Sequence, residues 1–220
     1  MNLLAIDTSA NLCSVGIWDM QQNALLASVS EDIGKGHAEL LMGQVQSSLE
    51  FARLNLSQID RFVVSLGPGS FAGVRVGIAA ARGFGLSLGK PVIGVTTLEA
   101  CVGYARKIKP GDEPLISLLD ARRNEVYVQF PNEAPCLMSS EIAAVSVTEN
   151  EFSCCGSAAP DILALAKTGN TVVHDAGVFP IDIYAEIAAS RTSIPDTMPE
   201  PVYLRNADAK RQSGFAVERA

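Results

Sequence analysis

Apolar and polar positions at the start of the chain alternate in short runs that predict three sequential strands. Residues 3–6, 14–19 and 24–30 are rich in apolar side chains, and short polar turns separate them. Strands joined by links this short pair as antiparallel neighbours. We therefore expect the chain to open with a three-stranded antiparallel meander.

The pattern then changes to a helical period. Leu41, Val45, Leu49 and Ala52 recur at spacings of three and four residues, which places them on one face of a helix. We predict this helix over residues 36–54, followed by strands at 61–66 and 91–96 and helices at 72–88 and 98–107. Strands that alternate with helices pair in parallel, so the order βββαβαβα predicts an α/β lobe of the ribonuclease-H-like or actin-like ATPase type.

Residues 107–114 are the best candidate for a linker, because they carry two prolines, one glycine and four charged side chains. After it, residues 115–120 repeat the pattern of residues 3–7, and both runs end in an aspartate, which indicates an internal duplication. We therefore predict two βββαβαβα-type lobes: an N-terminal lobe at residues 1–108, and a reduced C-terminal lobe with a tail at residues 109–220.

The second half of the chain is less regular than the first. We predict strands near residues 137–143 and 171–174, and helices near 160–167 and 181–190. The segment after Arg191 is rich in proline, so we expect an extended tail with frayed last residues.

Composition narrows the function classes. Apolar residues make up 48% of the chain and charged residues 19%, which is typical of a packed globular protein. The net charge of −7 argues against a large basic surface for nucleic acid, so any such contact would be shared with a partner. No apolar run of about 18 residues occurs and the N-terminus has no basic leader, so we expect a cytoplasmic protein without a membrane partner.

The five cysteines are odd in number and irregularly spaced, without a C-x-x-C pair. Neither a disulfide framework nor a zinc ribbon is indicated, and we expect reduced, mostly buried thiols.

Asp7, Thr8 and Ser9 follow the first strand, where an actin-like ATPase places a carboxylate near its metal and hydroxyls near the phosphates. The same residue types also favour a plain turn, because their side chains bond to their own backbone. A two-metal nuclease would need a second acid on the next core strand. Residues 62–66 contain none, which excludes the nuclease.

Gly67, Gly69 and Ser70 lie in a turn between a strand and a helix, where free backbone amides can bind an anion. The turn satisfies G-x-G-x-x-A but lacks the G-K-[ST] of a Walker loop, and it does not follow the first strand as a dinucleotide fingerprint does, which favours a purely structural turn. This turn and the residues Asp7, Thr8 and Ser9 together form the candidate nucleotide site. If the chain is not an enzyme, we expect this site to be vestigial. The alternative function is an actin-like small-molecule kinase that uses MgATP.

A row of small residues recurs every four positions along the helix at 72–88: Gly73, Gly77, Ala81 and Gly85. Glycine lowers helix propensity by roughly 1 kcal/mol, a cost that close packing can offset. The row predicts close approach either to the chain's own sheet and first helix, or to a helix of another subunit.

His37 begins the first helix, but a metal-binding helix needs a second ligand four residues later, where this chain has Leu41. No metal site is expected there. A serine protease is not indicated either, because the G-x-S-x-G motif is absent.

Five ordered motifs, followed by a Pro-x-Tyr-x-Arg segment at 201–205, resemble those of the TsaB (YeaZ) family: residues 4–9, 37–41, 67–77, 94–100 and 120–127. The resemblance implies an actin-like fold and a non-catalytic relative of TsaD in tRNA threonylcarbamoyladenosine biosynthesis. In TsaD the first helix carries a His-x-Glu-x-His metal motif. This chain keeps His37 and Glu39 but has Leu41 in place of the second histidine.

The same resemblance implies an accessory subunit that needs no cofactor and supports modification of adenosine 37 of tRNA. It would bind a TsaD-type catalytic subunit and a TsaE-type ATPase, contact tRNA indirectly through the complex, and form a homodimer when alone. Family members pair through their two N-terminal helices, which leads us to predict a partner interface at six residues: Leu41, Val45, Gly73, Gly77, Ala81 and Gly85.

Overall fold

The computed structural model describes residues 1–34, 36–148, 152–194 and 197–205. In chain order the elements are β1 (Asn2–Asp7), β2 (Leu12–Asp19), β3 (Ala24–Asp32), α1 (His37–Ala52), the 3₁₀ helix η1 (Leu56–Gln58), β4 (Ile59–Ser65), α2 (Phe71–Leu88), β5 (Val92–Val95), α3 (Thr97–Ile108), β6 (Leu115–Asp120), β7 (Glu125–Gln129), β8 (Cys136–Ser139), α4 (Ser140–Thr148), β9 (Ser153–Cys155), α5 (Ala159–Ala166), β10 (Thr171–His174) and α6 (Ile181–Ser190).

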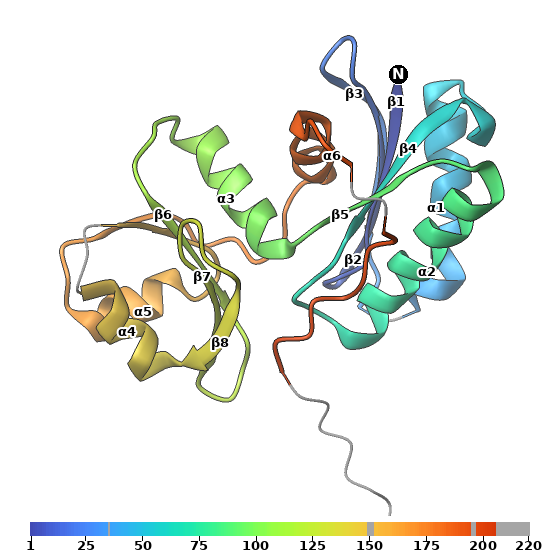
Figure 1. The fold of residues 1–220 in the computed structure, drawn as a ribbon. Coiled ribbons are helices and arrows are strands. Elements are labelled where there is room, and N and C mark those ends of the chain that lie inside the picture. The colour runs from blue at the N-terminus through green and yellow to red at the C-terminus, as the bar shows by residue number, and fades with distance from the viewer. Residues whose placement is uncertain (35, 149–151, 195–196, 206–220) are drawn as a thin grey trace, which may run out of the picture.

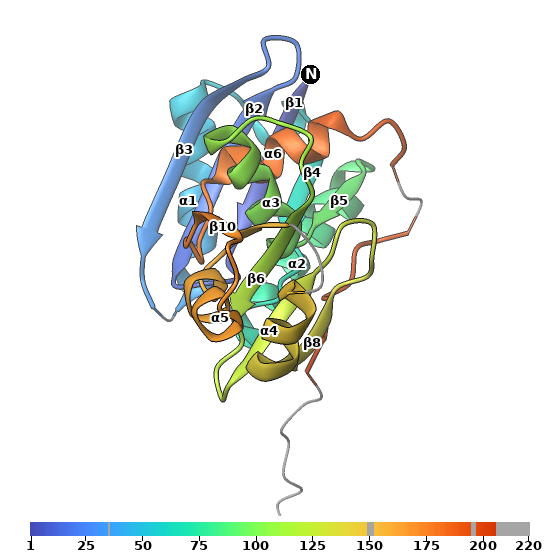
Figure 2. The same cartoon turned by 90° about the vertical axis from the view of Figure 1, so that its left-hand side faces the viewer.

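The strands form two five-stranded sheets that share one topology. The first has the order β3-β2-β1-β4-β5 and the second β10-β9-β6-β7-β8. When β6 is matched to β1, each strand of the second sheet takes the place of its counterpart in the first. The antiparallel pairing of β1 with β2 recurs in β6 and β7, and the parallel pairing of β1 with β4 recurs in β6 and β9. The predicted duplication and the actin-like ATPase fold are therefore confirmed (Figures 1 and 2).

Alternation along β1 separates two cores of the first lobe. Leu4 and Ile6 point toward α1 and α2, while Leu3 and Ala5 point to the opposite face, toward α6. This alternation follows from the two-residue period of a strand. The second sheet has its own outer core with α4 and α5.

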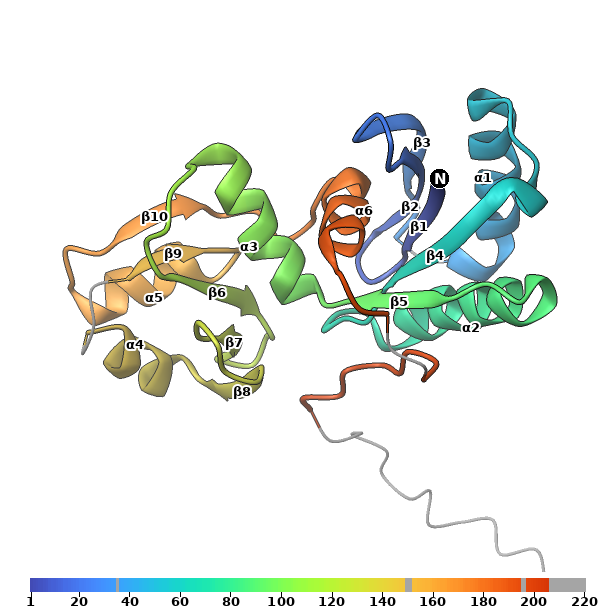
Figure 3. The ribbon, with the colours of Figure 1, turned by 45° about the horizontal axis from the view of Figure 1, so that its top comes forward.

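The third helix of each half crosses to the sheet of the other half. Helix α3 packs on β6 of the second sheet, whereas α6 packs on β1 and β2 of the first. Both helices lie between the sheets (Figure 3). Leu98 of α3 and Tyr184 of α6 share one central core there. This exchange ties the lobes together and places the turns at the ends of β1 and β6 opposite each other.

The predicted boundary at residues 108 and 109 falls between α3 and β6, but the chain does not stay in the second lobe after crossing it. Helix α6 and the tail return to the first lobe, where the Val202 amide donates to the Leu66 carbonyl at 3.0 Å. Residues 197–205 contain no helix or strand, in agreement with the predicted extended tail. The prediction for the last residues concerns positions 206–220, which lie outside the described part of the chain.

The second half differs from prediction around residues 137–143, where a single strand was expected. Strand β8 ends at Ser139, whose hydroxyl accepts from the Ile142 amide at 3.3 Å, and α4 begins directly after it. Ala143, Ala144 and Val147 are the buried face of this helix. A short apolar run fits a strand or a helix equally well, and here the polar cap decides.

Helix α2 has the length and hydropathy of a membrane span. Its inner side, however, packs on the first sheet through Val74 and Ile78. It is therefore a core helix of this lobe.

Candidate functional site

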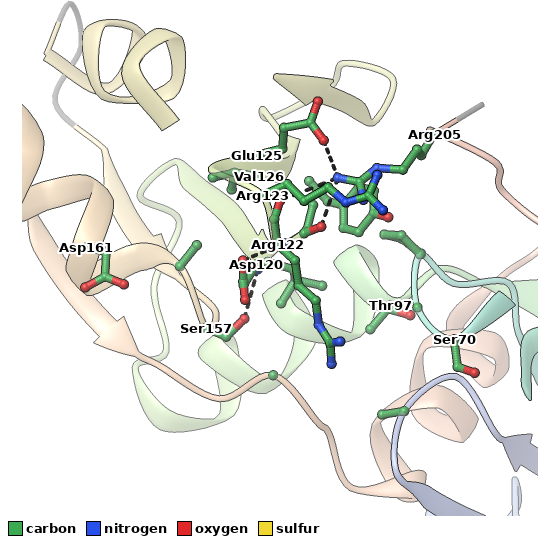
Figure 4. Close-up of a pocket in the computed structure, with 18 of the residues that line it drawn as sticks. Ser70, Thr97, Asp120, Arg122, Arg123, Glu125, Val126, Ser157, Asp161 and Arg205 are labelled. Carbon is green, nitrogen blue, oxygen red and sulfur yellow. Dashed lines mark hydrogen bonds and ion pairs between the residues drawn. The ribbon is translucent and has the colours of Figure 1, made fainter. Parts of the chain in front are cut away.

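A cleft of about 1350 Å³ lies between the two lobes. Its first-lobe wall consists of the β1–β2 turn, the β4–α2 turn and Thr97 at the start of α3. The second-lobe wall consists of the β6–β7 turn and part of α5, and Arg205 of the tail closes one side. Figure 4 shows Ser70 and Thr97 on one side of this cleft and Asp120 with Arg122 on the other.

The first-lobe turns are packed tightly onto each other. The Thr8 hydroxyl donates to the Gly73 carbonyl at 2.7 Å, and the Ser70 amide donates to the Ser9 carbonyl at 2.6 Å. A Cβ atom at Gly69 would overlap with the Ser9 carbonyl oxygen. The glycine here allows two backbone segments to meet, and several polar groups that could bind a phosphate are already satisfied within the chain.

Asp7 is 3% exposed and does not line the cleft. Its Oδ1 accepts from the Ser9 amide at 2.9 Å, and the Tyr184 hydroxyl of α6 lies beside the carboxyl. Burial raises the pKa of Asp7, although the hydrogen bonds from Ser9 oppose the change. Burial and the nearby Asp7 charge also raise the pKa of Tyr184. The carboxylate that an ATPase would direct at its metal is therefore enclosed in the core.

The corresponding turn of the second lobe is open. Asp120 is exposed, and its carboxylate accepts from the Arg122 amide at 2.7 Å. Arg122, Arg123 and Asn124 have φ values of 61°, 55° and 60°, so three successive residues other than glycine adopt the left-handed conformation. This conformation directs the Arg122 side chain into the cleft (Figure 4).

Charges in the cleft balance one another. The described lining contains equal numbers of basic and acidic residues: Arg122, Arg123 and Arg205 against Asp120, Glu125 and Asp161. Arg205 is itself engaged, since it forms an ion pair with Glu125 and donates to the Ala121 carbonyl at 2.9 Å. A cleft with this balance does not concentrate positive charge as a triphosphate site does.

Comparisons with known proteins identify the family. A family model described as "TsaD: tRNA N6-adenosine threonylcarbamoyltransferase" matches residues 28–177. The "tRNA threonylcarbamoyladenosine biosynthesis protein TsaB" of Escherichia coli K12 is 30% identical over 227 aligned residues, which cover 94% of this chain and 95% of that protein. The chain belongs to the TsaB (YeaZ) family. A protein of the same name from Bacillus subtilis is 32% identical over 127 residues, or 58% of this chain and 53% of that one.

Solved structures agree with the TsaB family. A Pseudomonas aeruginosa protein described as having similarity to peptidase YEAZ superposes with a TM-score of 0.74 and 27% identity, covering 93% of this chain and 99% of that one. A structure named YeaZ from the same organism gives a TM-score of 0.69 and 26% identity over 86% of this chain and 91% of that one. The two-lobed fold is thus that of the family.

In this TsaB-family chain, His37 serves the fold. It is buried, and its Nε2 contacts the Ala10 carbonyl at 2.9 Å, which attaches the start of α1 to the β1–β2 turn. Because a carbonyl can only accept, Nε2 carries the proton. Leu41, which stands one helical turn further, is 1% exposed in the outer core of the first lobe.

The six residues predicted at the partner interface all lie inside the chain. Leu41, Val45 and Ala81 belong to the core between the sheet and the two helices. A Cβ atom at Gly77 would lie 2.5 Å from the Thr8 hydroxyl oxygen, and one at Gly73 would overlap with the Thr8 carbonyl. Gly85 meets Val92 in the same way. The row therefore packs on its own sheet, one of the two options open from the sequence, and its side chains are not available to a partner.

Sequence reasoning missed residues that only the fold brings to the site. Tyr184 reaches Asp7 from a helix of the opposite half, and no spacing in the sequence connects the two. Arg122 could have been found, because the duplication equates the turn after Asp120 with the turn after Asp7. Arg205 lies in the Pro-x-Tyr-x-Arg segment, for which the sequence predicted no structural or functional role.

Proposed function

We propose that this chain is the non-catalytic scaffold subunit of a tRNA threonylcarbamoyladenosine modification complex, and that it binds a TsaD-type catalytic subunit through α1 and α2. The observation that carries the proposal is the exposure of large apolar side chains on these two helices. Phe51 is 70% and Leu86 71% exposed, and Leu40, Met42 and Phe71 are also exposed. Apolar side chains gathered on adjacent helices are typical of a protein interface.

Small residues lie between these apolar side chains. On α2 the exposed stripe contains Ala72, Ala79 and Gly83, and on α1 it contains Gly43. A Cβ atom at Gly43 or Gly83 would have no neighbour within 4 Å, so both glycines face open space. Small residues on an outer helical face permit close approach of a second helix.

Other features favour an accessory role over catalysis. The Asp7 carboxyl is enclosed and the turns around Ser9 and Ser70 satisfy each other, which suits a scaffold better than an ATPase. The net charge of −7 favours indirect contact with tRNA, through the catalytic subunit. The name of the Escherichia coli relative supports the same pathway. A TsaE-type ATPase would join the assembly at a further surface.

The test mixes the purified chain with the TsaD-type subunit of the same organism and measures the mass of the complex by light scattering. We expect a heterodimer that Leu86→Arg abolishes, because a charge would be buried at the interface. The matched control is Val145→Arg on α4, the counterpart of α1 in the second lobe, where Val145 is 60% exposed. It should leave the complex intact, and both variants should keep the melting temperature of the parent.

Two results would contradict the proposed scaffold function. One is the absence of a complex at micromolar concentrations, and the other is a complex that Leu86→Arg and Val145→Arg affect equally. If the chain alone bound MgATP and transferred phosphate to a small molecule, the kinase alternative would take its place. A homodimer of the free chain that dissociates on addition of the catalytic subunit would support a shared surface on α1 and α2.

A further inference from the structure

Three side chains that the proposed scaffold function does not use meet between α3 and the second sheet. Cys101 comes from α3, Cys155 from the end of β9 and His174 from the end of β10. Figure 3 shows α3 beside the sheet that contains these two strands. The Sγ atoms of the two cysteines lie 3.5 Å apart, and the ligand atoms of all three residues lie within 4.8 Å of one another. Both cysteines are 0% exposed.

The histidine ring is oriented for hydrogen bonding and not for a metal. Its Nε2 lies 3.1 Å from the Cys101 carbonyl, which can only accept, so Nε2 carries a proton. Its Nδ1 accepts from the Ala176 amide at 3.2 Å. A metal on Nε2 would displace that proton to Nδ1, where it would face another N–H. Metal-binding histidines instead donate their second N–H to an acceptor.

The two thiols are electrostatically unequal. The hydrogen bond from the Cys101 thiol lowers the pKa of Cys155 to about 6 against the opposing effect of burial, and the nearby His174 ring adds to the lowering. Burial raises the pKa of Cys101 well above its ordinary value. Thiolate character is what makes a cysteine nucleophilic toward peroxides. The Cys155 thiol donates its own proton to the Ile116 carbonyl at 3.4 Å. Once that proton is lost, Cys155 has the properties of the attacking sulfur and Cys101 those of the resolving thiol.

We propose that Cys101 and Cys155 are a redox-active dithiol that a hydroperoxide converts reversibly into a disulfide. The Cys155 thiolate attacks the outer peroxide oxygen, the O–O bond breaks, and the alcohol or water leaves with a proton, which forms a sulfenic acid. The Cys101 sulfur then attacks the Cys155 sulfur and water leaves. In total, two thiols lose two hydrogen atoms, and the hydroperoxide is reduced to one alcohol or water and one further water. Two equivalents of a thiol such as glutathione reverse the reaction.

The position of Cys101 and Cys155 in the fold determines what their disulfide would do to the structure. Helix α3 follows β5 of the first sheet directly, while Cys155 belongs to the second sheet. The new bond would therefore fasten the connection between the lobes. Ser157, two residues after Cys155, lines the cleft, so the thiols lie just behind its second-lobe wall. We expect a small hydroperoxide to reach them from that side.

The test treats the full chain with hydrogen peroxide, alkylates the free thiols after denaturation, and maps the peptides by mass spectrometry. The chain has five cysteines, so we expect three alkylated thiols and one peptide pair joined through Cys101 and Cys155. Dithiothreitol should restore all five. The Cys101→Ser variant keeps a hydroxyl that can donate to the Cys155 sulfur, and it should stop at a sulfenic acid on Cys155, detectable with a dimedone probe.

The matched control is Cys154→Ala, because Cys154 is the equally buried neighbour on the other side of β9. This variant should still form the disulfide. The wild-type map needs no substitution, so a variant that fails to fold does not obscure the result. Three outcomes would overturn the proposal: five unmodified thiols after treatment, a disulfide through Cys154 or between chains, or one zinc ion per untreated chain that His174→Ala removes.

Discussion

The two lobes share one topology but differ in the length of their helices and in the exposure of the aspartate at the matching turn. The first lobe has long elements, with 16 residues in α1 and 18 in α2, while the matching α4 and α5 have 9 and 8. The first lobe has closed its site turn, with Asp7 buried, whereas the second lobe keeps Asp120 exposed at the matching turn. The larger lobe has the exposed apolar helices, and the smaller one contributes the open wall of the cleft.

This difference separates two properties that an actin-like enzyme needs together. A nucleotide site requires both turns to remain open toward the cleft, because each supplies groups to the phosphates. When one turn is closed by its own hydrogen bonds, the lobes still form a stable frame, but half of the site is lost. The comparison therefore favours a protein that acts through its outer surface.

The largest effect on stability should come from a substitution that forces the closed turn of the first lobe apart. Gly73→Ala places a methyl group against the Thr8 carbonyl, so we expect a loss of about 3 kcal/mol or more in the free energy of unfolding. The matched control is Gly83→Ala on the outer face of the same helix. It should stabilise the chain by about 0.5–1 kcal/mol, because alanine favours a helix and its methyl group meets nothing. Urea denaturation measures both, and equal effects would refute the closed turn.

The next effect concerns the two aspartates. Because burial raises the pKa of Asp7, the folded state holds this proton more tightly than the unfolded chain does. The wild type should lose stability relative to Asp7→Asn as the pH rises from the unfolded pKa, about 3.9, through the folded one.

At pH 8 we expect Asp7→Asn to melt about 2–4 °C higher than the wild type, the shift that about 1 kcal/mol gives in a chain of this size. The difference should shrink as the pH falls through about 3.9 and vanish well below it, where Asp7 is neutral in both the folded and the unfolded chain. Asp120→Asn, at the exposed counterpart, should change the free energy of unfolding by less than about 0.5 kcal/mol. If the difference in melting temperature between wild type and variant does not change with pH for either Asp7→Asn or Asp120→Asn, the proposed contrast between the two turns is wrong.

The smallest effect should come from the tail that connects the lobes. Arg205 pairs with Glu125, and both side chains are partly exposed, so Arg205→Ala should lower the free energy of unfolding by about 1 kcal/mol or less. Limited proteolysis should nonetheless cut residues 197–205 faster in this variant. Arg53→Ala, at the exposed residue directly after α1, serves as the control. Equal cleavage rates would show that Arg205 does not hold the tail.

Helical periodicity identified α2 but could not tell which of its faces is buried. The inner row of Gly73, Gly77 and Gly85 and the outer stripe of Ala79 and Gly83 both fit a helix packed closely on one side. The sheet selects the inner row, because its glycines meet Thr8 and Val92. Similarly, β9 has only three residues and α4 nine, too few for a period to be distinguished.

The sequence by itself determined the fold class, the duplication and most of the first lobe, because those features rest on local periods of two and 3.6 residues and on turn residues. Only the tertiary structure decided which residues from distant parts of the chain are in contact. Tyr184 meets Asp7, and Cys101 meets Cys155 and His174, because α3 and α6 exchange sheets. Contacts between residues so far apart in the chain depend on how the layers pack, which no local pattern of apolar and polar residues specifies.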